Sequence, residues 1–224
     1  MAIEIQPVHP DLRWFDDRCI ICPERGKLTK EHIIRQSLGG RLWMKFLCAK
    51  CNNERFQPEE QRDRAWALEC RLAVEHLRVR SPLPEDPLPD WPRLNLAEVA
   101  AAEVPSRLIL LMAYEFAACV AGQRIYESSW DPVRARLMDS TQRSFLEVER
   151  WITRKYQWTH GLWVRETVPR VTVEVRLFRF MKYLVRFDVS DSRFALRAYT
   201  SDLATGREDF GDCVETPPTP DSSE

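Results

Sequence analysis

Two closely spaced cysteine pairs constrain this chain more than any other feature of its sequence. Cys19 and Cys22 form one C-x-x-C pair, Cys48 and Cys51 form the second, and 25 residues separate the two pairs. A single pair would fit a redox-active dithiol equally well, but no βαβ pattern surrounds either pair. Four thiolates match the tetrahedral shell of a structural zinc ion. We therefore predict that these four cysteines bind one structural zinc.

The overall composition is that of an ordinary globular protein. The 224 residues are 44% hydrophobic and 30% charged, so the chain can bury its own core as one large or two small domains. The formal net charge of −1 gives no global sign of a nucleic-acid partner. The first residues lack a secretory signal, and the best apolar run, from Leu108 to Ala121, is interrupted by Glu115. We expect a cytoplasmic protein without a membrane partner, and a reducing compartment favours metal over disulfides.

Changes in residue pattern divide the chain into four regions. Residues 1–57 hold both cysteine pairs and are rich in turns. Residues 58–157 are predicted to be helical, with a proline-rich linker at 81–93. Residues 158–211 are predicted to form antiparallel strands, and the Pro-, Ser- and acid-rich tail at 212–224 is predicted to be disordered.

Within these regions, two segments carry the clearest patterns. Residues 58–80 open with proline and acidic residues, as a helix start prefers, and the helical pattern resumes from Asn95 to about Arg154. Residues 171–177 alternate apolar and polar side chains, which predicts a half-buried strand. Of the other cysteines, Cys70 and Cys119 lie in apolar helical patterns and are predicted to be core residues.

Polar residues of a distinctive kind lie between and after the cysteine pairs. Residues 28–53 read L-T-K-E-H-I-I-R-Q-S-L-G-G-R-L-W-M-K-F-L-C-A-K-C-N-N. This stretch resembles the HNH endonucleases, particularly members with an E-H-I-I-P…L-G-G…C-x-x-C-N signature, and in the order of its pairs also the phage Holliday-junction resolvases. The resemblance covers about residues 19–55. A vaguer likeness to longer proteins with this signature continues at A-Y-E-F (113–116) and D-P-V-R (131–134).

The resemblance implies a ββα-metal site, in which a β-hairpin and the following helix grip one divalent ion beside the zinc. It makes His32 the general base that deprotonates the attacking water, and Glu31 and Asn52 the ligands of a catalytic Mg²⁺ or Mn²⁺. The chemistry is consistent, because a histidine titrates near neutral pH and a carboxylate with an amide oxygen suits a hard cation. The cation would stabilise charge on the scissile phosphate.

Each of these residues also has a plainer interpretation. His32 fits a spare zinc ligand or a surface histidine. Asn52 or Asn53 fits a helix N-cap, and Gly39-Gly40 fit a turn better than a phosphate loop. Two positions depart from the pattern: the proline after E-H-I-I is Arg35 here, and the bracing middle asparagine has no counterpart, with Trp43 or Lys45 near its expected place. A catalytically inactive module therefore stays open as an alternative.

Local charge favours a polyanionic partner for the cysteine-rich region. Between residues 25 and 55, eight basic residues face two acidic ones, a local charge of +6, or +4 once four thiolates and Zn²⁺ add −2. Such a patch neutralises phosphates while the whole chain stays near neutrality. The residues that we predict to contact nucleic acid are Arg35, Arg41, Lys45 and Lys50.

These patterns together predict an α+β protein with a zinc-stapled ββα-metal nuclease domain, a helical middle region and a small antiparallel C-terminal sheet. The function that the resemblance implies is metal-dependent DNA cleavage. The alternative is a non-catalytic zinc-knuckle module that binds nucleic acid or protein. A redox or metal-sensing protein is a third possibility, which a thiol titration with and without zinc distinguishes.

Overall fold

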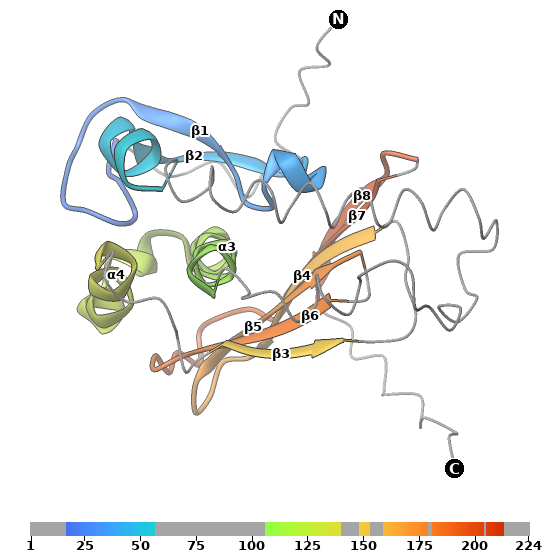
Figure 1. The fold of residues 1–224 in the computed structure, drawn as a ribbon. Coiled ribbons are helices and arrows are strands. Elements are labelled where there is room, and N and C mark those ends of the chain that lie inside the picture. The colour runs from blue at the N-terminus through green and yellow to red at the C-terminus, as the bar shows by residue number, and fades with distance from the viewer. Residues whose placement is uncertain are drawn as a thin grey trace, which may run out of the picture.

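The computed structural model describes residues 17–56, 106–139, 148–152, 159–178, 181–203 and 205–212. Within these residues the chain forms a β-hairpin with a helical segment, a group of helices and a six-stranded antiparallel sheet (Figure 1). The expected mixture of helix and antiparallel sheet is therefore confirmed. The predicted helix at 58–80, the linker at 81–93 and the tail beyond Asp212 lie outside the described residues, and the domain boundaries remain predictions.

The first unit is a hairpin followed by a short helical segment. Strands β1 (Leu28–His32) and β2 (Trp43–Cys48) pair antiparallel, and the π-helical segment η3 (Lys50–Phe56) follows directly. The connection contains the 3-10 turn η2 (Gln36–Leu38).

Gly39 and Gly40 are turn residues, as predicted. Gly39 has φ of 90°, a conformation that favours glycine, and its N–H bonds the carbonyl of Gln36. A Cβ at Gly40 would collide with the carbonyl oxygen of Ile34. The two glycines therefore serve the close return of the chain from β1 to β2.

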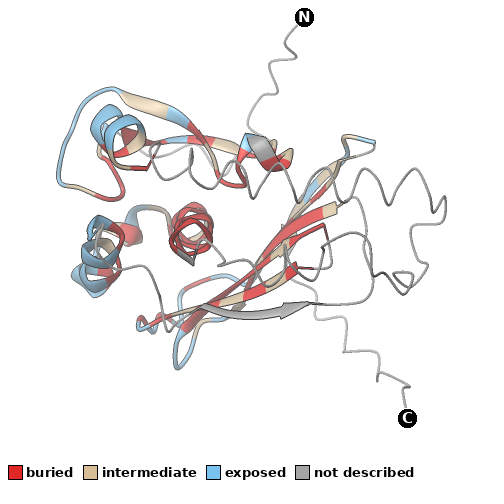
Figure 2. Ribbon diagram, viewed as in Figure 1, coloured by how far each residue is buried: buried red, intermediate tan, exposed pale blue. Residues whose placement is uncertain are grey.

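The helices lie between this hairpin and the sheet. α3 (Ser106–Ala121) passes into the 3-10 segments η4 (Gly122–Tyr126) and η5 (Ser128–Trp130), and α4 (Asp131–Met138) follows. α3 is buried on every side, including Cys119, as expected of a core cysteine (Figure 2). The helical stretch Arg107–Tyr126 is long and apolar enough to span a membrane, but most of it is buried inside the protein. Burial in the core accounts for its apolar composition.

The C-terminal part is a single sheet with strand order β3-β6-β5-β4-β7-β8, in which every neighbouring pair is antiparallel. The strands are β3 (Val148–Ile152), β4 (Thr159–Glu166), β5 (Val171–Leu177), β6 (Met181–Phe187), β7 (Arg197–Asp202) and β8 (Glu208–Asp212). The alternating segment that predicted a strand is β5, but Thr172 and Glu174 on its polar face are also buried.

One strand lies where the sequence pattern indicated helix. β3 falls inside the region predicted to be helical to about Arg154, and it pairs with β6 at the edge of the sheet. Its sequence V-E-R-W-I carries β-branched and aromatic residues, which fit a pleated surface. Pairing with a partner more than 30 residues later in the chain, here Val148 with Val185, decides its conformation.

His160 on β4 joins the sheet to the hairpin connection. Its Nε2 lies 2.8 Å from the carbonyl oxygen of Leu38, and its Nδ1 accepts the N–H of Phe178 at 3.2 Å. An Nδ1 that accepts leaves Nε2 as the donor, so the ring is the neutral tautomer. Burial lowers the pKa of His160 from its usual 6.5 to about 4. The histidine is therefore a neutral structural link.

This link predicts a pH-dependent stability. Between pH 6.5 and pH 4, His160 is protonated in the unfolded chain but not in the folded chain. The contribution of His160 to the free energy of unfolding is therefore fully present above pH 6.5 and declines as the pH falls toward 4. Between pH 7 and 5 the loss should be about 2 kcal/mol. His160→Gln should be less stable at pH 7 but lack this component. Urea unfolding of both proteins at pH 7 and pH 5 measures it, and an identical pH dependence in the variant would contradict it.

Candidate functional site

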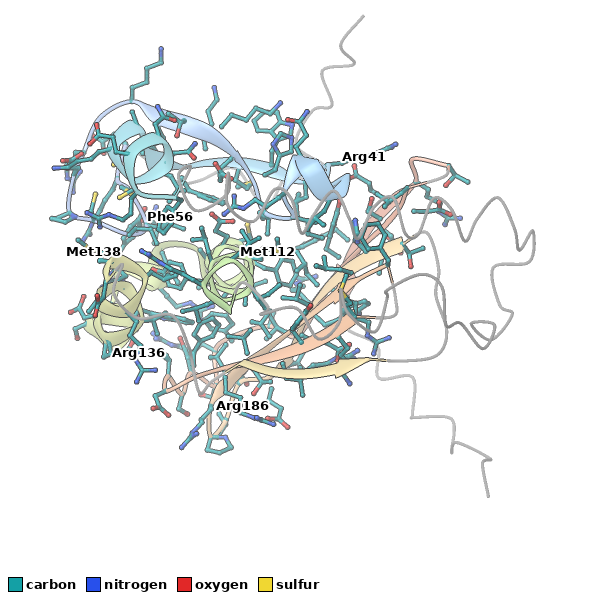
Figure 3. All side chains as sticks on the ribbon, in the orientation of Figure 1. Arg41, Phe56, Met112, Arg136, Met138 and Arg186 are labelled. Carbon is teal, nitrogen blue, oxygen red and sulfur yellow. The ribbon has the colours of Figure 1, made fainter. Side chains whose placement is uncertain are left out.

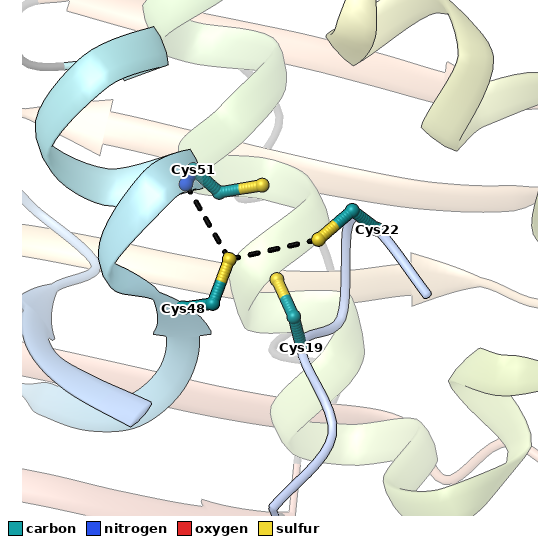
Figure 4. Close-up of side chains that lie close together, drawn as sticks. All are labelled: Cys19, Cys22, Cys48 and Cys51. Atoms are coloured by element: carbon teal, nitrogen blue, oxygen red, sulfur yellow. Dashed lines mark hydrogen bonds between the residues drawn. The ribbon is translucent and has the colours of Figure 1, made fainter. Parts of the chain in front are cut away.

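The four paired cysteines converge on one point. Cys19 and Cys22 come from the loop before β1, Cys48 ends β2, and Cys51 lies in η3 (Figure 4). All four Sγ atoms lie within 4.8 Å of one another, and those of Cys22 and Cys48 are 3.6 Å apart. Zinc–sulfur bonds of about 2.3 Å place tetrahedral sulfurs about 3.8 Å apart. The donor set and its spacing therefore fit a structural metal ion such as zinc.

The thiols cannot all ionise together without a cation. All four are free thiols, and Cys19, Cys48 and Cys51 are buried. A hydrogen bond from Cys51 lowers the pKa of Cys19 to about 5, whereas burial raises the pKa of Cys48 to about 12. The pKa of Cys51 is raised, first by its hydrogen bond to Cys19 and then by burial. A divalent cation removes this conflict, because it binds all four as thiolates.

The core helix holds the first cysteine pair in place. The N–H of Ile20, between Cys19 and Cys22, bonds the carbonyl of Phe46 on β2 at 3.0 Å. The Tyr114 hydroxyl on α3 donates to the carbonyl of Ile20 at 2.8 Å. Tyr126 of η4 donates to the carbonyl of Arg18 at 2.7 Å. Tyr114 belongs to the A-Y-E-F stretch of α3.

The first prediction for the site concerns metal content. Protein purified under reducing conditions should contain one zinc per chain by elemental analysis. Cys51→Ser should lose the zinc and unfold the hairpin unit, because metal binding contributes much of a small unit's folding free energy. Cys119→Ser replaces a buried cysteine outside the cluster and should keep one zinc. Wild-type protein without zinc would rule out the assignment.

The second prediction for the site concerns the hydrogen bond from the Tyr114 hydroxyl to the carbonyl of Ile20. Tyr114→Phe leaves the buried carbonyl of Ile20 without this donor and should lower the free energy of unfolding by about 1–3 kcal/mol at unchanged zinc stoichiometry. Tyr126→Phe removes the corresponding bond at a half-buried position, where water replaces the hydroxyl, and should cost less. Denaturant unfolding measures both. Equal stability of Tyr114→Phe and wild type would show that the bond does not tether the cysteine loop.

The two consecutive candidates on β1 are oriented differently. Glu31 pairs with buried Met44 and is itself buried, whereas His32 pairs with Trp43 and is half-buried. Consecutive residues of a strand point to opposite faces, so Glu31 faces the core and His32 the outer face of the hairpin. Lys30 shares the outer face, and its Nζ lies 4.1 Å from the centre of the Trp43 ring.

Asn52 lies against the strand that carries both of these residues. Its side-chain nitrogen donates to the Thr29 hydroxyl at 3.0 Å and to the carbonyl of Lys30 at 3.3 Å. It lies inside η3, which begins at Lys50, so neither Asn52 nor Asn53 is the N-cap considered from the sequence. The structure therefore brings Asn52 to Thr29 and Lys30, the two residues of β1 that precede Glu31 and His32.

The cysteine-rich segment matches one known family. Residues 19–60 match the family model of the HNH endonucleases. This segment, called the HNH segment below, is similar to the HNH endonucleases. The match and the four clustered cysteines confirm the resemblance that the sequence suggested. No curated protein and no solved structure matches the chain.

Arg35 of the HNH segment is buried, so the prediction made for it is wrong. It was predicted to contact nucleic acid, but its side chain is 5% exposed, pairs with Glu31, and lies 3.8 Å from the carboxylate of Glu115 on α3. A guanidinium in this environment does not reach a phosphate in solvent. The sequence does mark residue 35 as unusual, because an arginine stands there where the family pattern has proline.

The other three predicted contact residues differ in exposure. Lys45 and Lys50 are exposed, and Lys50 lies 3.7 Å from Glu24 in a surface ion pair. Arg41 is half-buried, and its guanidinium packs against Gly206 in the β7–β8 turn (Figure 3). The basic patch that remains open on the HNH segment is therefore smaller than the sequence predicted.

His32 is suited to accept a proton. Burial, and then the charge of Lys30, lower the pKa of His32 below its usual 6.5. The ring is therefore neutral at physiological pH and presents an acceptor nitrogen. Sequence reasoning had counted Lys30 only as part of the basic patch.

Proposed function

We propose that this protein is a metal-dependent endonuclease that hydrolyses phosphodiester bonds in DNA. The observation that carries the proposal is a neutral, half-buried His32 on the outer face of a hairpin within an HNH-type segment. Asn52 from η3 is hydrogen-bonded to the same strand. His32 provides the proton acceptor. Asn52, bonded to Thr29 and Lys30 of the same strand, provides a metal-ligating side chain.

In the proposed reaction His32 acts as the general base. It accepts a proton from the water whose oxygen attacks phosphorus. The bond from phosphorus to the 3′-oxygen breaks, and this oxygen takes a proton from solvent water. The products are a 5′-phosphate and a 3′-hydroxyl, as the HNH resemblance implies. Because His32 is neutral, it is ready to accept this proton without prior deprotonation.

Glu31 and Asn52 would hold a Mg²⁺ or Mn²⁺ ion at the site. One carboxylate and one amide oxygen form a hard donor set that such ions prefer and that leaves positions for water and phosphate. When bound, the ion offsets negative charge on the scissile phosphate. The side-chain nitrogen of Asn52 faces Thr29 and Lys30, so the opposite atom of its amide group, Oδ1, is the one for the ion.

DNA would lie along the outer face of the hairpin. Lys30, Lys45 and Lys50 are all exposed there or nearby and would contact phosphates. Lys30 already stacks on Trp43, so both residues would border the substrate beside His32. Contacts of this kind position the backbone without reading sequence.

A second candidate function is a non-catalytic zinc module that binds nucleic acid or protein. The burial of Glu31 favours it, because the carboxylate pairs with Arg35 in the interior. In such a module the hairpin and its lysines would still bind a polyanion. The two functions differ in whether any cleavage occurs.

A cleavage assay on supercoiled plasmid with Mg²⁺ or Mn²⁺ tests the proposal. His32→Ala should lower the rate by about 10²–10⁴-fold while zinc content and DNA binding persist, because the base is not a zinc ligand. Asn52→Ala should be partly rescued by excess Mn²⁺, whereas His32→Ala should not.

Two outcomes would count against the nuclease. Wild-type protein that binds DNA but leaves it intact in Mg²⁺, Mn²⁺ and Ni²⁺ would favour the non-catalytic module. Cleavage that continues unchanged in His32→Ala would place the activity outside this histidine. An exposed residue directly after β6 provides the control: Asp188→Asn should cleave at the wild-type rate.

A further inference from the structure

One buried side chain, that of Arg35, contacts two residues of β1 and the core helix α3. Arg35 Nη1 pairs with a carboxylate oxygen of Glu31 and donates to the main-chain carbonyl of His32 at 3.1 Å. Its Nη2 lies 3.8 Å from Glu115 on α3. The side chains of Arg35, Glu31 and Glu115 are 5%, 9% and 0% exposed. The guanidinium therefore joins two consecutive residues of β1 to the core helix.

The main chain of the same residue organises the turn that follows. The carbonyl of Arg35 accepts the N–H of Leu38 at 2.9 Å and that of Gly40 at 3.2 Å. The N–H of Ile33, directly after His32, bonds the carbonyl of Leu42 across the turn. The main chain of Arg35 thus organises the turn after β1, and the bond between Ile33 and Leu42 closes that turn.

We infer that Arg35 is a positioning residue of the nuclease site: it orients Glu31 and the backbone at His32, and Glu115 anchors it to α3. This inference rests on the proposed function. The sequence pattern left the site without its proline and without a bracing asparagine. The contacts of Arg35 provide a brace from the position where the proline is missing.

The arrangement requires a guanidinium and not merely a positive charge. Arginine offers five N–H donors in a rigid planar fork, so it can serve a carboxylate, a carbonyl and a second carboxylate from one place. A lysine carries the same charge on a single nitrogen and cannot span these three groups. Engagement of Glu31 Oε1 by Arg35 also leaves Oε2 as the oxygen that Glu31 would give to a metal ion.

Arg35→Lys tests this role while it preserves charge. The zinc-loaded variant should bind Mn²⁺ about 10–100-fold more weakly, measured without DNA by the electron paramagnetic resonance signal of free Mn²⁺. Its kcat for plasmid cleavage should fall by a similar factor, with KM for DNA and zinc content unchanged, because residues that orient a ligand act on the metal and not on DNA affinity.

A matched control comes from the loop before β7. Arg193 also makes several contacts through one guanidinium, to the carboxylates of Asp191 and Glu127, and neither of these lies on the hairpin or on α3. Arg193→Lys should lower stability and leave Mn²⁺ affinity and kcat at wild-type values. A general effect of replacing a multiply bonded arginine would instead appear in both variants and would overturn the inference.

Glu115→Gln provides a second test if Arg35→Lys does not fold. It keeps the shape of the side chain, removes the distant anchor, and should weaken Mn²⁺ binding several-fold. Wild-type Mn²⁺ affinity and kcat in whichever of these variants folds, beside an active wild type, would overturn the inference alone. A wild type that neither binds Mn²⁺ nor cleaves DNA would refute the proposed function, and the inference with it.

Discussion

The arrangement of this protein depends on the burial of one helix. α3 is mostly apolar and is buried on every side, so its surface must be covered by other elements. The hairpin unit and the sheet lie on either side of it (Figures 1 and 2). Its Tyr114 packs edge-on against Trp130 at 5.8 Å between ring centres and against Phe187 at 6.4 Å, and it also bonds Ile20. The helix therefore couples the HNH-type segment to the rest of the chain.

The hairpin unit needs two kinds of support, because a segment of about 40 residues rarely buries enough apolar surface to fold alone. One support is local: four thiols drawn together where a metal ion resolves their competing ionisation. The other is distant: the hydroxyl of Tyr114 and the carboxylate of Glu115 reach the hairpin from α3, and His160 reaches its connection from the sheet. A metal ion at the four thiols would hold the ends of the unit, and the tertiary contacts hold Ile20 and the connection between β1 and β2.

Glu31 and His32 are consecutive residues of β1 that lie in different environments. Glu31 faces the interior and His32 the outer face, so the same strand exposes a proton acceptor and buries a carboxylate. A buried carboxylate requires a partner, which Arg35 provides, at the cost of its availability to nucleic acid. A residue that departs from a family pattern is thus explained by the packing around it.

The sequence alone determined the features that depend on neighbours along the chain. The spacing of the cysteines, the period-two alternation of β5 and the glycines of the connection follow from local geometry, and each was predictable. Only the tertiary structure decided that Arg35 is buried, that β3 is a strand and that His160 bonds Leu38. The physical reason is that which face of an element is buried depends on what packs against it. Here the packing partners lie up to 122 positions apart in the sequence, as for Leu38 and His160.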